Sequence, residues 1–330
     1  MIRMRAAAAV LVLGLWFSVN VTSQGGSPRA NPSGNGAFTF GLIGDMPYGP
    51  EGELKFPNVI ADINQDRTLA FVAHDGDIKN GSTVCSNEMF ANRLERFYEI
   101  EHPLIYVPGD NEWTDCHRAN NGAYDPIERL AYLRDLFFPT DESLGARTLT
   151  LERQSAEPQY ALYRENVRWV VKNVMFAGLH VVGSNNNLGR TPAADAEYAA
   201  RNAATVSWLH DTFDLATAQG YKAVMLVIQA NPNFDLPPAQ RTGFNHLLAA
   251  LEAETLAFEK PVVLVHGDSH YFRIDKPMLG TISRRRVENF TRVETFGEND
   301  NHWLRVTVEP GNPNVFAFDQ RIVATNLVQH

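Results

Sequence analysis

Short apolar runs alternate with amphipathic segments over most of the chain. The apolar runs predict β-strands at residues 37–43, 69–74, 104–107, 174–182, 223–228 and 262–266. The segments between them have the apolar spacing of helices at 53–64, 88–100, 126–138, 193–218 and 243–258. Apolar strands separated by amphipathic helices are typical of parallel strands that are buried on both faces. The pattern therefore predicts an α/β protein with sheet layers inside helical layers.

The last third of the chain has a different pattern. Apolar and polar residues alternate in three closely spaced segments, 289–296, 303–308 and 315–322. Such alternation predicts antiparallel strands. From residue 37 onward, glycine, proline and polar residues are scattered among the apolar runs, with no second linker and no internal repeat. We therefore expect one continuous domain at 37–330.

The first residues have the features of an export signal. Arg3 and Arg5 precede an uncharged run at 6–19, and small residues follow near Ser23. A basic start, an apolar stretch and a small-residue exit are typical of a cleaved signal peptide, whereas a membrane-spanning helix needs about 20 apolar residues. We expect a signal peptide at 1–23 and a flexible linker, rich in Gly, Ser and Pro, at 24–36. The mature chain would then be periplasmic or secreted, with no stable membrane span.

Composition narrows the classes of function. The 330 residues include 29 basic and 38 acidic side chains, which gives a formal net charge of −9. Proteins that bind nucleic acids generally need an excess of lysine and arginine to neutralise phosphates, so we expect no general nucleic-acid binding. The presence of only two cysteines excludes a cysteine-rich zinc module and a disulfide-dense scaffold.

Polar segments follow the predicted strands. They lie at 44–48, 75–81, 108–113, 183–187, 229–232 and 266–270. Ligands of open α/β sheets bind beyond the carboxyl ends of the strands, so we expect these six ends to meet in one region. The side chains delivered there include four carboxylates and one imidazole, those of Asp45, Asp77, Asp110, Asp268 and His270.

Converging carboxylates must either take up protons or share cations. Oxygen-rich sites with one or two imidazoles suit Mn, Mg, Ca or Fe. Two such cations about 3.5–4 Å apart can activate a water molecule and hold both oxygens of a phosphoryl displacement. One Gly-Asp pair after a strand is usually a simple turn. Three such pairs, together with Gly-Asp-Ser-His at the end of a later strand, favour a metal site.

The order of these motifs resembles that of the calcineurin-like metallophosphoesterase superfamily. The matching segments are Gly44-Asp45, Gly76-Asp77-Ile-Lys-Asn80-Gly81, Pro108-Gly109-Asp110-Asn111-Glu112 and Gly267-Asp268-Ser-His270. The likeness covers most of the chain after residue 37. It implies a single-domain fold of four layers, α/β/β/α, with two mixed sheets, and a two-metal hydrolase of phosphate esters.

The resemblance also implies roles for individual residues. Asp45 would bind the first metal ion and Asp77 would bridge two ions. Asp110 stands where the family usually has an asparagine ligand, and His270 matches the last histidine of the family pattern. The cofactors would be divalent metal ions, two in number, drawn from Mn, Fe, Mg, Ca and Zn.

Several positions differ from the family pattern, and the changes replace nitrogen ligands with oxygen ligands. Asp268 replaces the first histidine of the last motif, and Gln229 lies near the place of a missing histidine, so both are candidate metal ligands. Pro47 stands where the first motif has a histidine, and Tyr48 beside it is a candidate substitute. Asn111 stands where a histidine normally acts on the leaving group, which makes it a candidate catalytic residue.

Other polar residues near the motifs are candidates for proton transfer and substrate binding. Imidazole titrates near neutral pH, so three histidines are candidates to replace the missing proton donor: His74, His117 and His266. A structural role is the alternative for each. The candidate substrate contacts are Tyr48, Lys79, Asn80 and Arg118. For Lys79 and Arg118 the alternative is an ion pair with neighbouring carboxylates.

The two cysteines lie shortly after the second and third motifs. In an exported protein, two cysteines in adjacent strand-end loops are expected to form a disulfide, here between Cys85 and Cys116. The alternative is a pair of unrelated thiols. A bridge would hold two ligand-bearing loops in register.

The sequence thus predicts an exported, metal-dependent phosphoesterase that hydrolyses a small-molecule phosphate mono- or diester with metal-activated water. One rival is a related hydrolase that acts on a different ester. A second is a protein that keeps the fold and binds an anionic or sugar ligand without turnover, and the replaced histidines support it. A third is a structural surface protein, but the sequence has no repeat or exposed binding segment that would support it.

Overall fold

The computed structural model describes residues 36–327. The expected signal peptide at 1–23 lies outside the described residues, as does the expected linker at 24–36 apart from its last residue. Within 36–327, no helix is both long enough and apolar enough to cross a membrane.

The strands form two mixed sheets. The first sheet contains β1 (Phe38–Ile43), β2 (Leu69–His74), β3 (Leu104–Tyr106), β11 (Trp303–Val308) and β12 (Phe316–Arg321), in the order β12-β11-β1-β2-β3. The second contains β4 (Glu152–Arg153), β5 (Val167–Val171), β6 (Val174–Gly178), β7 (Ala223–Val227), β8 (Val262–His266), β9 (Arg273–Asp275) and β10 (Phe290–Glu294), in the order β4-β5-β6-β7-β8-β10-β9. The strands β1, β2 and β3 are parallel, and so are β6, β7, β8 and β10.

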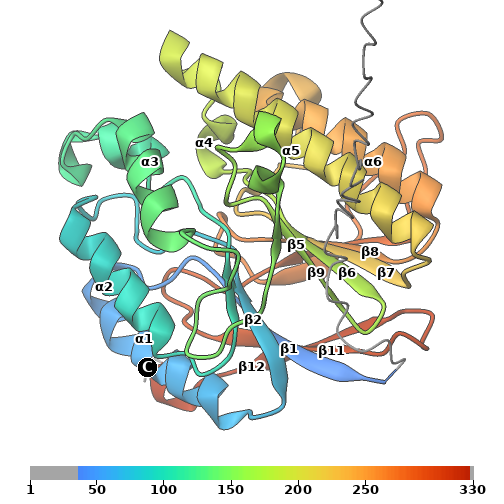
Figure 1. Cartoon of the computed structure of the whole chain (residues 1–330), viewed down its shortest axis with the longest axis horizontal. Helices are drawn as coiled ribbons and strands as arrows, with labels where there is room; N and C mark the ends of the chain where they lie inside the picture. Colours follow the sequence, from blue (N-terminus) through green and yellow to red (C-terminus); the bar gives the residue numbers. More distant parts are fainter. Residues whose placement is uncertain (1–35, 328–330) are drawn as a thin grey trace, which may run out of the picture.

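Helices cover the outer face of each sheet. The α-helices are α1 (Gly49–Gln65), α2 (Asn87–Tyr98), α3 (Pro126–Phe137), α4 (Gly183–Asn186), α5 (Pro192–Ala218) and α6 (Asn245–Phe258). Short 3-10 turns lie at Thr114–His117, Ala119–Asn121, Gln154–Ala156, Pro158–Tyr160, Pro238–Gln240, Thr242–Phe244 and Ala324–Asn326. Helices α5 and α6 pack on the seven-stranded sheet, and α1, α2 and α3 pack on the five-stranded sheet (Figure 1). The expected α/β fold of four layers is therefore confirmed.

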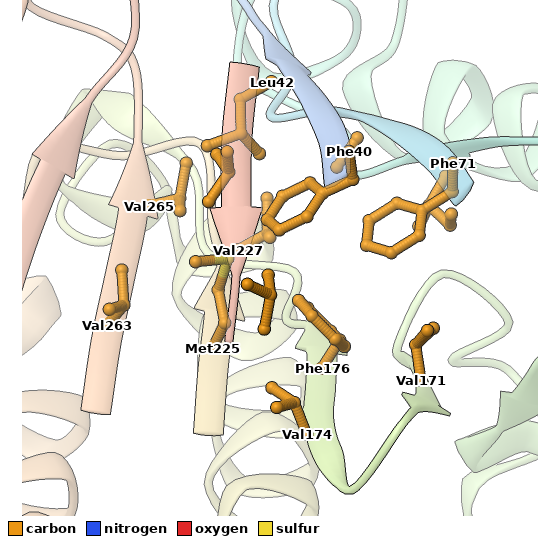
Figure 2. Packing of buried hydrophobic residues seen from close by; sticks show 14 of the residues in the cluster. Phe40, Leu42, Phe71, Val171, Val174, Phe176, Met225, Val227, Val263 and Val265 are labelled. Atoms are coloured by element: carbon orange, nitrogen blue, oxygen red, sulfur yellow. The ribbon is translucent and has the colours of Figure 1, made fainter. Parts of the chain in front are cut away.

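The strand pattern explains why both sheets are buried on two faces. In β6, Val174 and Phe176 point into the core between the sheets, whereas Met175 and Ala177 pack under the helices. This follows from the two-residue period of a strand. Figure 2 shows the core between the sheets, where Phe40 and Phe71 of the first sheet face Phe176 of the second.

The pairing expected for one of the three antiparallel strands is only partly confirmed. The segment predicted at 289–296 is β10, which lies in the other sheet from β11 and β12 and pairs in parallel with β8. Its antiparallel neighbour is the three-residue strand β9. The antiparallel pairing of β11 with β12 is confirmed. Strand β6 also ends at Gly178 rather than at 182, because the chain leaves the sheet there toward the site.

Candidate functional site

The predicted ligand residues lie at the carboxyl ends of strands from both sheets. Asp45, Asp77 and Asp110 follow β1, β2 and β3 of the five-stranded sheet. Asp268 and His270 follow β8 of the seven-stranded sheet. Strands that run parallel end at the same edge of a sheet, so each sheet delivers its polar residues to one edge. The structure brings all five residues into one region.

Three of these carboxylates meet closely enough to hold one cation. One oxygen from each of Asp77, Asp110 and Asp268 lies within 4.8 Å of the other two. Gly183 lies against this cluster, and a methyl group on its Cα would lie 2.8 Å from Oδ1 of Asp110 and 2.8 Å from Oδ1 of Asp268. The two Oδ1 atoms therefore converge in the space left by the missing side chain of Gly183.

Asp77 accepts four hydrogen bonds from the protein. Its Oδ2 accepts from the Tyr48 hydroxyl at 3.0 Å, Nδ2 of Asn111 at 2.8 Å and Nε2 of Gln229 at 3.0 Å. Its Oδ1 accepts from the backbone N–H of Asn111 at 3.1 Å. The backbone N–H of Gly183 donates to Oε1 of Gln229 at 2.7 Å, which turns the amide nitrogen of Gln229 toward Asp77. In this arrangement Gln229 is a hydrogen-bond donor to Asp77 and does not offer an oxygen to a cation.

Asp45 and His270 form the other half of the site. The Tyr48 hydroxyl lies between the two halves, 3.3 Å from Oδ1 of Asp45 and 3.0 Å from Oδ2 of Asp77. Nε2 of His270 lies 3.7 Å from the same Oδ1 of Asp45, and Nδ1 of His270 lies 3.3 Å from Oε2 of Glu298. The rings of Tyr48 and His270 meet edge to face, with centroids 5.2 Å apart. Tyr48 is thus in contact with three candidate metal ligands.

The carboxylates repel one another and are removed from water. Burial raises the pKa of Asp45 well above its ordinary value, and the charges of Asp75 and Asp268 raise it further. Burial also raises the pKa of Asp77. The pKa of Asp110 rises to about 8 because of burial and the charge of Asp268. Groups with such shifts bind a proton or a cation in preference to remaining bare anions, so the donor set fits a divalent cation.

Four site residues have a backbone conformation that is uncommon outside glycine. The angle φ is positive at Asp45 (48°), Asp77 (56°), Asp268 (74°) and His270 (58°). Residues held in this region cost of order 1–3 kcal/mol each, and they cluster at active sites and ligand clamps. The strain therefore agrees with a functional role for these strand ends.

The site opens into a cavity of about 390 Å³. Of the candidate substrate contacts, Tyr48 and Asn80 line it. Lys79 is fully buried, and its Nζ donates to the backbone carbonyl of Asn80 at 2.9 Å. Arg118 is 2.7 Å from Oδ2 of Asp115, which is the ion-pair alternative for that residue. Asn111 lines the cavity as well.

The three histidines considered as proton donors are not among the residues that line this cavity. His74 is buried with Nε2 at 3.1 Å from the backbone carbonyl of Met46, and burial lowers its pKa to about 4. His266 is buried too, and burial lowers its pKa to about 3. Nδ1 of His117 lies 2.7 Å from the backbone carbonyl of Thr114. These contacts favour the structural alternative for His74 and His266.

The expected disulfide is confirmed. Cys85 and Cys116 are joined and both are buried. The bridge connects the segment after β2 to the 3-10 turn after β3. It therefore ties together the two loops that carry Asp77 and Asp110.

Ser184 is a site residue that the sequence pattern does not identify. Its Oγ donates to Oδ2 of Asp110 at 2.6 Å and lies 3.3 Å from Oδ1 of Asp115. From Ser184 (φ 51°) to Asn187 (φ 66°) every φ is positive, so α4 is a left-handed turn. Asparagine adopts this conformation more readily than most residues. In the sequence, the three consecutive asparagines at 185–187 are the feature that could have indicated this left-handed turn.

Glu112 is a second residue whose role becomes visible only in the structure. It is fully buried, and its Oε1 accepts from the backbone N–H groups of Asp77 at 3.0 Å and Gly109 at 2.9 Å. The Tyr106 hydroxyl donates to the same oxygen at 2.7 Å. Glu112 thus fixes the turns that present Asp77 and Asp110.

Comparisons with known proteins identify the fold. No protein-family profile matches the chain, and no curated protein matches it in sequence. The solved structure of PhoD superposes with a TM-score of 0.55 at 13% identity, over 88% of this chain and 70% of that one. GAP50, described as the anchor in the inner membrane complex of Plasmodium, gives a TM-score of 0.46 at 10% identity, over 87% of this chain and 89% of that one.

A 5'-nucleotidase precursor from Thermus thermophilus gives a TM-score of 0.44 at 10% identity, over 87% of this chain and 54% of that one. Of these three, only the likeness to PhoD is close enough to carry an argument about architecture. At 13% identity it concerns the fold alone. With two mixed sheets between helical layers, the chain shares the fold of PhoD.

Proposed function

We propose that the protein hydrolyses a phosphate mono- or diester with the help of a divalent cation. The observation that carries this proposal is the convergence of Asp77, Asp110 and Asp268 beside an open cavity, with carboxylates supplied by both sheets. Carboxylate oxygens are preferred ligands of hard divalent cations. Fold alone does not determine function, so the proposal rests on the site.

The chain's own residues have distinct tasks in this reaction. Asp77, Asp110 and Asp268 would hold the cation. A bound divalent cation neutralises the negative charge that develops on the phosphoryl oxygens and makes a water molecule a better nucleophile. Ser184 fixes the orientation of Asp110 through its 2.6 Å hydrogen bond. His270 lines the cavity, and in the proposed reaction it donates a hydrogen bond to the ester oxygen that leaves.

A second candidate function is binding without turnover. The observation that favours it is the hydrogen bonding of Asp77, whose Oδ2 is already satisfied by Tyr48, Asn111 and Gln229. The same polar wall would then hold a sugar or an anionic ligand. This candidate predicts a bound ligand that is recovered chemically unchanged.

The substitution Asp77→Asn tests the proposal. It removes one charge from the centre of the cluster and keeps the size of the side chain. We expect the variant to lose most of its metal, measured by elemental analysis after dialysis against Mn²⁺. We expect hydrolysis of p-nitrophenyl phosphate and bis(p-nitrophenyl) phosphate to fall by about a hundredfold or more. The matched control is Asp214→Asn, an exposed carboxylate on α5, which should behave as wild type.

The outcomes separate the two candidates. Full activity in Asp77→Asn would exclude metal-dependent hydrolysis at this cluster. A wild-type protein that binds Mn²⁺ and hydrolyses neither ester would favour binding without turnover.

We also propose that the protein is exported and loses residues 1–23. The buried disulfide between Cys85 and Cys116 supports this, because disulfides form and persist in oxidising compartments. The signal-like pattern at the start of the sequence is the second line of support. The phosphate ester would then be met outside the cytoplasm.

A further inference from the structure

The two halves of the site are not equivalent. On one side, Asp77, Asp110 and Asp268 each bring one oxygen to within 4.8 Å of the other two. On the other side, Asp45 and His270 approach each other with Nε2 at 3.7 Å from Oδ1. Among the described residues, no other group of three acidic, histidine or cysteine side chains comes together as the first side does.

The Tyr48 hydroxyl fills the space between Asp45 and Asp77. It lies 3.3 Å from Oδ1 of Asp45 and 3.0 Å from Oδ2 of Asp77. Nδ2 of Asn111 donates to the same hydroxyl at 2.9 Å, and the Tyr48 side chain is buried. The hydroxyl is therefore fixed by groups on three sides. A cation that touched both Asp45 and Asp77 would need the volume that this oxygen now takes.

Hydrogen bonds also settle which carboxylates remain available. Oδ2 of Asp77 faces three donors on the Tyr48 side. Oδ2 of Asp45 accepts from the backbone N–H of Asp268 at 2.9 Å. By contrast, Oδ1 of Asp110 and Oδ1 of Asp268 converge beside Gly183. The open cradle for a cation thus lies between Asp110 and Asp268, beside Gly183.

From this asymmetry we propose that the site binds one divalent cation, at Asp77, Asp110 and Asp268, and that the Tyr48 hydroxyl closes the second position. The inference rests on the proposed metal-binding function and concerns its stoichiometry. It replaces the sequence-based expectation of two ions with one. Asp45 and His270 then stay free of the cation, with His270 lining the substrate cavity and Asp45 buried behind it.

The test counts bound ions directly. The metal-free full-length protein is titrated with Mn²⁺, and free Mn²⁺ is followed by its electron paramagnetic resonance signal. Wild type is expected to bind one equivalent. Tyr48→Phe removes only the hydroxyl, which opens the space beside Asp45, and is expected to bind two equivalents. Two ions in that variant should also give a spin-coupled spectrum that wild type lacks.

A matched control shows whether the second ion depends on the position of the Tyr48 hydroxyl or follows the removal of any buried tyrosine hydroxyl. Tyr198→Phe removes the hydroxyl of another buried tyrosine, on α5, which does not line the cavity. It is expected to bind one equivalent, as wild type does. Circular dichroism of all three proteins shows whether each is folded, and the wild-type count stands even if a variant is not.

Each outcome decides a different statement. Two equivalents in wild type would overturn the single-ion inference and leave the proposed function standing. One equivalent in both wild type and Tyr48→Phe would overturn the role of the Tyr48 hydroxyl. No bound ion in wild type would overturn the proposed metal-dependent function, and the inference with it.

Discussion

Neutral hydrogen-bond donors shape this site as much as carboxylates do. Asn111 and Gln229 each direct an amide nitrogen to Oδ2 of Asp77, and Ser184 directs its hydroxyl to Oδ2 of Asp110. Such donors stabilise a buried carboxylate without cancelling its charge. The negative potential therefore remains available to a cation. A histidine in place of either amide would instead compete for the cation as a ligand.

The substitution Gly183→Ala tests how closely the carboxylates converge. The new methyl group would lie 2.8 Å from Oδ1 of both Asp110 and Asp268, so the two side chains must move apart. Overpacking of this kind costs about 1–3 kcal/mol. If this cost is lost from ion binding, Mn²⁺ affinity in a calorimetric titration falls about five- to 150-fold. Gly311→Ala, which meets no atom within 4 Å, is the control. Unchanged affinity in Gly183→Ala would show that the cation binds elsewhere.

Local sequence context decides which site residues are predictable. Asp45, Asp77 and Asp268 each follow a glycine or precede one at the end of an apolar run, so pattern and chemistry coincide. Ser184 follows Gly183 in the same way, but it carries no charge, and its partner Asp110 lies 74 positions away in the chain. The position of Tyr48 between two carboxylates is equally a product of packing. Contacts over such distances depend on how the two sheets dock.

At the scale of elements, strand ends and the turns that follow them build the site. The run of positive φ from Ser184 to Asn187 reverses the chain shortly after β6, so that Ser184 reaches Asp110. Arg201 of α5 holds this turn from behind, donating to Oδ1 of Asn186 at 2.6 Å and to the backbone carbonyl of His180 at 2.9 Å. Helix α5 thus supports the site without lining it.

The disulfide is the covalent link between two such elements. In the chain-entropy account, closing a loop of 31 residues stabilises the native state by about 3–4 kcal/mol. We expect the double variant Cys85→Ala/Cys116→Ala to lose about this much free energy of unfolding in urea titration. Wild type with its disulfide reduced should fall to the same value. Equal stability of the double variant and oxidised wild type would contradict the bridge.

Element type was easier to predict than pairing. Composition alone predicts burial on both faces for the most apolar strands, which are β1, β2, β7 and β8. The partner of β10 is set by where the chain returns after the segment between β9 and β10, which a hydrophobic pattern does not encode. Strands β4 and β9 have two and three residues, too few to show a period.

At the scale of the whole molecule, one aromatic cluster holds the two sheets together. Phe176 of β6 lies with its ring centroid 5.4 Å from that of Phe40, 5.2 Å from that of Phe71 and 5.4 Å from that of Trp169. Phe40 and Phe71 belong to the other sheet. The contact between the sheets is therefore a continuous apolar layer, and the polar site lies at its edge.

Truncation of Phe176 should weaken this layer at its centre. Phe176 is fully buried, and removing a buried phenylalanine side chain costs about 3–5 kcal/mol because the cavity closes only in part. Urea titration of Phe176→Ala should show this loss. Phe318→Ala, on the half-buried edge of the same core, should lose clearly less. Equal losses would mean that Phe176 is not central to the docking of the sheets.

The placement of the three carboxylates on two sheets has a mechanical consequence. Asp77 and Asp110 follow strands of one sheet, and Asp268 follows a strand of the other. Ligand distances in a metal site tolerate deviations of only about 0.2 Å, so even a small sliding of one sheet over the other would loosen the grip on an ion. Conversely, a bound ion would connect the two sheets through its carboxylate ligands and would oppose their sliding. We therefore expect an occupied site to make the whole sandwich more rigid.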